Sequence, residues 1–227
     1  VLNDGDIIID AGANIGLFTM FVCSQAKNLQ IYCFEPLKPI YDVLQKNLEN
    51  LEIQATQQIK AELMGLSDKI EVVEMQYYPK VSADSTAIPF DENRKIQQYV
   101  KTWDTHAVKI NKLAKFVPKF LRPWLIKRII HRLYKPTKIS CEFKPLSHFI
   151  DKYDIKQIDL LKIDAENYEW QVIHGIRDKH WPKIKQLSIE VHTHIPDGKD
   201  LLKQTINFLQ EKNFIVTSNK DGENRFE

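Results

Sequence analysis

Few features of the sequence mark a membrane, secreted or metal-cluster protein. No run reaches the roughly 18 apolar residues that a membrane-spanning helix needs, and no cleavable signal pattern is present. The 3 cysteines, Cys23, Cys33 and Cys141, are an odd number without metal-type spacing. Cys23 and Cys33 fall in apolar patterns, so we expect buried free thiols and a reducing, cytoplasmic location. The chain starts at Val1 rather than Met, from which we expect a piece of a longer polypeptide.

Acidic residues are missing from one segment. Between Lys109 and Lys138 the sequence has ten Lys and Arg residues and no Asp or Glu. Because the whole chain has a net charge of +2, the remaining residues carry a net charge of −8. A basic segment in an acidic body suggests a localised role for that segment. The composition is otherwise that of a globular protein, and 227 residues suit one large domain, which we expect to span 1–227.

Strand-type and helix-type patterns alternate over the first 66 residues. We expect strands over 6–10, 30–35 and 58–66, with a helix after each of the first two, and an extra antiparallel strand over 70–75. This alternation favours an α/β fold, in which a mostly parallel twisted sheet is covered by helices on both faces.

The alternation stops over 77–138, where five prolines occur and the periodicity is mixed. Residues 123–134 predict a basic amphipathic helix with five apolar side chains on one face: Trp124, Leu125, Ile129, Ile130 and Leu133. We expect 77–138 to be an insertion over the active end of the sheet. For the basic helix, the favoured role is a lid that closes over a bound substrate, and the second is a docking face for an acidic carrier protein. Contact with a membrane surface or a nucleic acid is the least favoured role.

The sheet pattern resumes after this insertion. Strands are expected over 139–143, 158–164, 186–192 and 214–218, and helices over 146–153, 168–176 and 199–211. A further antiparallel strand is then expected to be missing or truncated.

The turn after the first strand reads Asp10-Ala-Gly-Ala-Asn-Ile-Gly16. Ligands of open α/β sheets bind beyond the carboxyl ends of the strands, and Gly12 and Gly16 let the backbone approach a ligand. The spacing is neither that of a dinucleotide fingerprint nor that of a phosphate loop. Asp10 would repel a pyrophosphate but suits a cationic ligand such as S-adenosylmethionine, so we expect Asp10, Gly12, Asn14 and Gly16 to bind that cofactor. A plain strand-to-helix turn is the alternative.

Two further places fit an adenosyl ligand. Glu35 ends the second strand, where a carboxylate can accept both ribose hydroxyls, although dinucleotide enzymes also have an acid here. Ser67 and Asp68 follow the third strand, where an adenine edge would be bound; a simple turn is nearly as good an interpretation.

Several motifs occur in the order found in the FkbM family of methyltransferases, and the sequence resembles that family over about 1–76 and 139–218. The motifs are Ile9–Thr19, Phe34–Pro36, Gly65–Asp68, Ile158–Glu166 and Ile189–His192. The last resembles versions embedded in polyketide and non-ribosomal peptide assembly lines. The resemblance implies a Rossmann-like class I methyltransferase fold, S-adenosylmethionine as donor, and O-methylation of a natural product or sugar. The sequence departs from the family at Asn167, where a glycine is usual.

Methyl transfer to a hydroxyl requires the hydroxyl to lose its proton, so a base or a metal is expected near the methyl group. Candidates cluster at the ends of two later strands: Asp164, Glu166, Glu190, His192 and His194. We predict His192 as the base, supported by Glu190, and Asp164 near the sulfonium. A divalent metal would be held by Asp164, Glu190 and His192. Ordinary loop histidines and helix-start acids are the alternative.

The sequence thus predicts an S-adenosylmethionine-dependent O-methyltransferase for a small-molecule natural product or biosynthetic intermediate, free or carrier-bound. An RNA or protein methyltransferase of the same fold is one alternative. A non-catalytic module that binds a nucleotide or a partner is the other.

Overall fold

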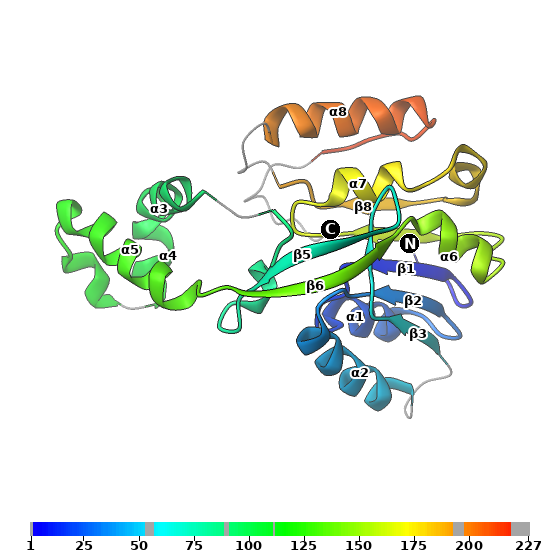
Figure 1. The fold of residues 1–227 in the computed structure, drawn as a ribbon, viewed down its shortest axis with the longest axis horizontal. Helices are drawn as coiled ribbons and strands as arrows, with labels where there is room; N and C mark the ends of the chain where they lie inside the picture. Colours follow the sequence, from blue (N-terminus) through cyan, green and yellow to red (C-terminus); the bar gives the residue numbers. More distant parts are fainter. Residues whose placement is uncertain (1, 53–56, 89–90, 111, 193–197, 219–227) are drawn as a thin grey trace.

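The computed structural model describes residues 2–52, 57–88, 91–110, 112–192 and 198–218. At its centre is a five-stranded sheet in the order β3-β2-β1-β7-β8, in which every neighbouring pair is parallel (Figure 1). The strands are β1 Ile7–Ala11, β2 Gln30–Phe34, β3 Gln58–Glu62, β7 Leu160–Ile163 and β8 Leu187–Ile189. The predicted α/β fold with a parallel sheet is confirmed.

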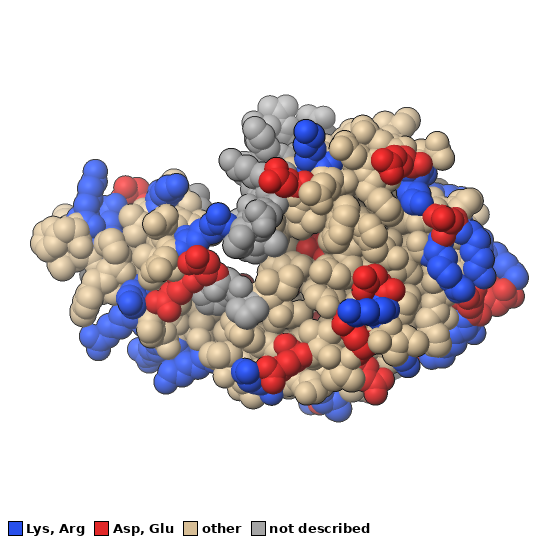
Figure 2. Space-filling model, turned by 45° about the horizontal axis from the view of Figure 1, so that its top comes forward, with Lys and Arg blue, Asp and Glu red and all other residues tan. Residues whose placement is uncertain are grey.

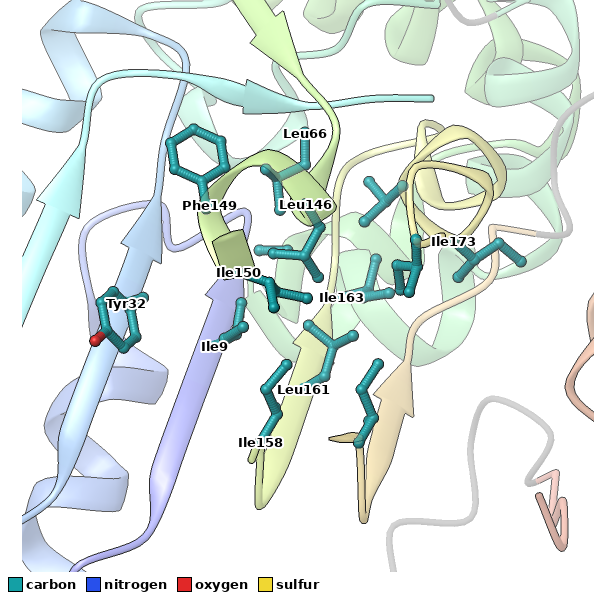
Figure 3. Close-up of a cluster of buried hydrophobic side chains, with 14 of the residues drawn as sticks. Ile9, Tyr32, Leu66, Leu146, Phe149, Ile150, Ile158, Leu161, Ile163 and Ile173 are labelled. Atoms are coloured by element: carbon teal, nitrogen blue, oxygen red, sulfur yellow. The ribbon is translucent and has the colours of Figure 1, made fainter. Parts of the chain in front are cut away.

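Helices cover both faces of this sheet because successive side chains of its strands point to opposite sides. In β1, Ile8 packs toward α1 and α2, whereas Ile9 packs toward α6 and α7. Figure 3 shows Ile9, Leu161 and Ile163 of the sheet meeting side chains of α6. Among the described residues, the helices beside this sheet are α1 Leu17–Gln25, α2 Lys38–Glu52, α6 Leu146–Lys152, α7 Glu169–His174 and α8 Gly198–Glu211.

A second sheet has three strands in the order β4-β6-β5: β4 Gly65–Leu66, β5 Glu71–Tyr77 and β6 Thr137–Lys144. β5 and β6 form the long antiparallel ribbon of Figure 1. The prediction of one strand over 58–66 is therefore wrong. This stretch forms two strands, of which β3 lies in the main sheet and β4 pairs with β6 in the second sheet. Gly65 permits this pairing, since a Cβ there would lie 2.2 Å from the ring of Phe143.

Residues between β5 and β6 form a helical segment beyond the end of this ribbon (Figure 1). It contains η1 Ser82–Asp84, α3 Glu92–Lys101, α4 Trp103–Ile110, η2 Lys112–Phe116, η3 Lys119–Leu121 and α5 Arg122–Leu133. The predicted helix is confirmed as α5, but its buried face differs from the predicted one. Ile126 and Ile130, one turn apart, enter a separate core with Ile96 and Trp103, and this rotation leaves Trp124 and Ile129 57% and 50% exposed.

The strand expected over 214–218 is also wrong, because this described stretch is not part of a strand. Phe214 packs on Trp181, with ring centroids 6.0 Å apart, whereas Ile215 is 98% exposed. Apolar packing thus holds the segment without backbone pairing to the three-residue β8. The cysteines are free thiols; Cys33 is buried as predicted, Cys23 is only partly buried, and Cys141 is buried as well. Within the described residues, no helix is both long and apolar enough to span a membrane.

Candidate active site

The turn after β1 passes very close to the end of β7. Gly12 has a φ of 77°, and a Cβ on it would lie 1.8 Å from the carbonyl oxygen of Asp164. The amides of Gly12 and Ala13 both donate to the carbonyl of Phe34, each at 3.0 Å. Glycine is therefore required at position 12 by sterics alone, and the turn joins the ends of β1, β2 and β7.

Asp10 supports this turn from inside the core. Its side chain is fully buried, accepts a hydrogen bond from Thr19 Oγ1 at 2.9 Å, and lies 3.1 Å from Lys162 Nζ. Lys162 also donates to the carbonyl oxygen of Gly12 at 2.8 Å. Burial raises the pKa of Asp10 and the lysine opposes that rise. The described residues that line the pocket include neither Asp10 nor Gly16. Of these two predicted cofactor-binding residues, Asp10 lies beneath the turn and Gly16 is at the start of α1.

A pocket opens where the strands of the main sheet end. Its polar lining comes from Asn14, Glu35, Asp164, Glu166 and Tyr168, together with Ser82 and Ser85 from the start of the predicted insertion. Its apolar lining includes Leu37, Ile40, Leu66, Met75, Phe143 and Val172. The carboxyl ends of parallel strands are where open α/β sheets bind ligands. Gly12, Asn14, Glu35 and Asp164, all predicted from the sequence, are therefore brought together around one pocket.

Glu35 is the most deeply held carboxylate of the pocket lining, with a residue exposure of 5%. Its oxygens accept the amides of Asn14 at 3.1 Å and Leu37 at 2.9 Å. Burial raises the pKa of Glu35 to about 7, against the lowering effect of these two amides. Because each carboxylate oxygen has two lone pairs, the group keeps capacity for two further hydroxyl donors.

Ser67 and Asp68 are not brought into the pocket lining. Ser67 is fully buried and donates to Glu71 Oε1 at 2.6 Å, whereas Asp68 is exposed. The two residues before them, Gly65 and Leu66, line the pocket instead.

Asp164, Glu166 and His192 form a tight group at one side of the pocket. One ligand atom from each lies within 4.8 Å of the others, and His192 Nε2 is 3.4 Å from Glu166 Oε2. The other ring nitrogen, Nδ1, is 3.0 Å from Oε1 of Glu169, whose side chain is 3% exposed. The structure thus unites three of the five candidates from the sequence, Asp164, Glu166 and His192, although the predicted metal set had Glu190 in place of Glu166.

Comparison with known proteins assigns the family. A family model described as the Methyltransferase FkbM domain matches residues 10–216. The chain belongs to the FkbM methyltransferase family. It is therefore a methyltransferase, and the matched region contains the β1 turn, Glu35 and the Asp164–Glu166–His192 group.

Several relatives bear names consistent with this family. Methyltransferase sdnD of Sordaria araneosa is 27% identical over 96% of this chain and 77% of its own length. The 31-O-demethyl-FK506 methyltransferase FkbM of Streptomyces tacrolimicus is 26% identical over 97% and 76%. The AMB antimetabolite synthetase AmbE of Pseudomonas aeruginosa is 30% identical over 85% of this chain, which matches only 9% of that protein. No solved structure matches the chain.

The carboxylates around His192 determine its protonation state. Burial alone would lower the pKa of His192, but Glu169, Glu166 and, more weakly, Glu190 raise it to about 9. The ring therefore carries a proton at neutral pH and must lose it before acting as a base. Burial raises the pKa of Glu166 to about 7, although His192 lowers it, so this carboxyl group exchanges protons near neutral pH.

Sequence reasoning missed the pocket-lining Ser82, Ser85 and Tyr168, and also Glu169 and Lys162, which support the site. Glu169 occupies the supporting position predicted for Glu190, which is exposed and outside the group. The sequence did contain a signal for Lys162, because a single lysine within a buried strand requires a charged or polar partner. His194, the remaining candidate, lies outside the described residues.

Proposed function

We propose that this FkbM domain transfers the methyl group of S-adenosylmethionine to a hydroxyl of a small-molecule natural product or biosynthetic intermediate. The observation that carries the proposal is the buried Glu35 carboxylate, fixed by two backbone amides at the wall of a pocket lined by the β1 turn. A carboxylate in this position suits the two ribose hydroxyls of an adenosyl ligand. The name of the Streptomyces tacrolimicus relative, which specifies a 31-O-demethyl substrate, supports hydroxyl as the acceptor class.

The other pocket residues fit the rest of that cofactor. Leu66, Phe143 and Val172 offer apolar surface for a planar base. Asp164 offers a carboxylate for the cationic end; its side chain is 32% exposed, with Oδ2 3.5 Å from Lys162 Nζ. Asp10 is already neutralised by Lys162, so its contribution is to hold the turn in place. The cofactor supplies the electrophilic methyl group, and these residues bind and orient it. Held geometry of this kind can supply about 7–11 kcal/mol of a displacement barrier.

The acceptor hydroxyl also has to lose a proton. The Asp164–Glu166–His192 group is the candidate for this step, because Glu166 lines the pocket and its pKa is near 7. A base or a bound divalent cation could serve there.

Ultraviolet cross-linking of S-adenosylmethionine labelled in its methyl group tests this function. Peptide mapping should find the label on segments that line the pocket, and excess S-adenosylhomocysteine should suppress it whereas NAD should not. Absence of labelling, or equal suppression by NAD, would contradict the proposal.

We infer further that the basic surface of the helical segment docks an acidic carrier protein that presents the acceptor. Figure 2 shows Lys and Arg side chains spread over this segment, at the left of the view. Among them stand exposed aromatic side chains: Phe116 is 71%, Phe120 79% and Trp124 57% exposed. Opposite charge steers such an encounter, and exposed aromatic side chains provide contact area. The match to a small part of AmbE shows a related sequence within a much longer chain.

Charge reversal tests this partner. The variant K119E/R128E/R132E should weaken binding of a strongly acidic carrier protein at least tenfold, and added salt should weaken wild-type binding. K156E is the matched control, because Lys156 is an exposed lysine outside the helical segment. Binding to phosphatidylserine vesicles without binding to the carrier would overturn the inference in favour of a lipid surface.

A further inference from the structure

We propose that Asp164, Glu166 and His192 form a binding site for one divalent transition-metal cation, of the Mn²⁺ or Zn²⁺ class. The site differs from the set predicted from the sequence, because Glu166 takes the place of the exposed Glu190. Binding of the cation is independent of the proposed function, whereas its role in methyl transfer rests on that function.

The three side chains converge from separate parts of the chain. Asp164 follows β7, Glu166 lies in the loop before α7, and His192 follows β8. Their ligand atoms lie within 4.8 Å of one another, with 3.4 Å between His192 Nε2 and Glu166 Oε2. Nitrogen and oxygen ligands bind at about 2.0–2.2 Å from such cations. Two ligand atoms on one ion can therefore be at most about 4.4 Å apart, so small side-chain movements close the site.

Glu169 provides a second, independent indication of a metal site. Its buried carboxylate binds His192 Nδ1 at 3.0 Å and so directs Nε2 toward Glu166. Glu169 Oε1 also accepts the amides of Ala165 at 3.2 Å and Asn167 at 3.1 Å, which fixes the loop that carries Glu166. Metal-binding histidines characteristically donate their second ring N–H to a carboxylate in this way. Glu169 is thus a positioning residue for the site.

The donor set indicates the class of ion. Two carboxylate oxygens and one imidazole nitrogen suit Mn²⁺, Zn²⁺ or Fe²⁺ better than Mg²⁺ or Ca²⁺, which prefer oxygen ligands alone. Three carboxylates, including that of Glu169, lie beside a single imidazole, and Lys162 Nζ is 3.5 Å from Asp164 Oδ2. A metal cation would replace the proton on Nε2 of His192 and balance the carboxylate charge in its place. Asp164 and Glu166 both line the pocket, and coordination positions on that side could accept and acidify an acceptor hydroxyl.

Titration of metal-stripped protein with Mn²⁺, followed by electron paramagnetic resonance of the free ion, tests the site. Wild-type protein should bind one Mn²⁺ per chain, with displacement by Zn²⁺. Asp164→Asn and Glu166→Gln each remove a ligand and should weaken binding at least tenfold. Glu169→Gln leaves every ligand in place and should weaken binding about 10- to 100-fold. Circular dichroism establishes that each variant is folded, and the two ligand variants and the positioning variant provide independent tests of the site.

Glu190→Gln is the discriminating control, because Glu190 belongs to the set predicted from the sequence but not to the observed group, and its charge acts on His192 more weakly than those of Glu169 and Glu166. It should weaken Mn²⁺ binding much less than Glu166→Gln does; an equal loss would overturn the assignment. Absence of Mn²⁺ and Zn²⁺ binding to wild-type protein, or wild-type affinity in both Glu166→Gln and Asp164→Asn, would also overturn it. Calorimetry with S-adenosylhomocysteine separates the two claims, since cofactor binding without metal binding refutes the cation site alone. Metal binding without cofactor binding refutes the proposed function alone.

Discussion

Replacing Lys162 by methionine removes the cation that neutralises Asp10 in the core. Asp10 is fully buried, and its Oδ1 lies 3.1 Å from Lys162 Nζ. The lysine side chain is itself only 15% exposed and donates to the Gly12 carbonyl. Methionine keeps most of the aliphatic stem, so Lys162→Met tests the charge and the hydrogen bond rather than the packing.

The cost follows from leaving one buried charge without its counter-ion. Removing one partner of a buried pair costs about 3–5 kcal/mol. We therefore expect the free energy of unfolding to fall by about that amount, which is more than a hundredfold in the folding equilibrium. The double variant Asp10→Asn/Lys162→Met leaves no buried charge and should recover most of the loss.

Urea denaturation followed by circular dichroism measures these differences. Lys156→Met is the control, since Lys156 pairs with Asp154 at the surface, where both side chains are at least 76% exposed. It should change stability by less than about 0.5 kcal/mol. If Lys162→Met costs no more than this control, or if the double variant is less stable than Lys162→Met, the account of Asp10 is wrong.

Two other perturbations address the turn and Glu35. Gly12→Ala should cost more than about 3 kcal/mol or prevent folding, because its Cβ would overlap Asp164. Gly5→Ala, also at positive φ but with nothing within 4 Å, should cost only about 1–2 kcal/mol; equal losses in urea would contradict the steric argument. The raised pKa of Glu35, about 7 against an ordinary 4.5, means that the folded chain holds this proton more tightly than the unfolded chain. Wild-type stability relative to Glu35→Gln should therefore fall by about 3 kcal/mol as pH rises from 4.5 to 7, and parallel pH profiles would refute this.

The buried strands could be predicted from the sequence because local pattern is enough for them. The strand segments around Ile8, Ile31 and Leu161 are short apolar runs followed by turn or helix signals, as expected of parallel strands covered on both faces. The place of the pocket then follows from topology, since parallel strands share one carboxyl edge. The positions of Gly12 and Glu35 at that edge could be predicted for the same reason.

The partners of individual charges could not be predicted, because they depend on tertiary register. Asp10 faces Lys162 because these two residues pair across β1 and β7, although 152 positions separate them in the chain. Glu169 has the sequence signature of a helix-start acid, and its contact with His192 exists only because α7 begins beside the end of β8. The local sequence pattern also could not predict which face of α5 is buried, because apolar side chains occur on more than one face of that helix.

Isothermal titration of S-adenosylhomocysteine into wild-type protein and Glu35→Gln tests the central claim that this pocket binds an adenosyl cofactor. Each hydrogen bond to a charged group contributes about 1.5–3 kcal/mol. Wild-type protein should therefore bind S-adenosylhomocysteine at least tenfold more tightly than Glu35→Gln, whereas Glu142→Gln, at an exposed position of β6, should match wild type. Equal affinity in wild type and Glu35→Gln, or no binding to wild type, would contradict the account.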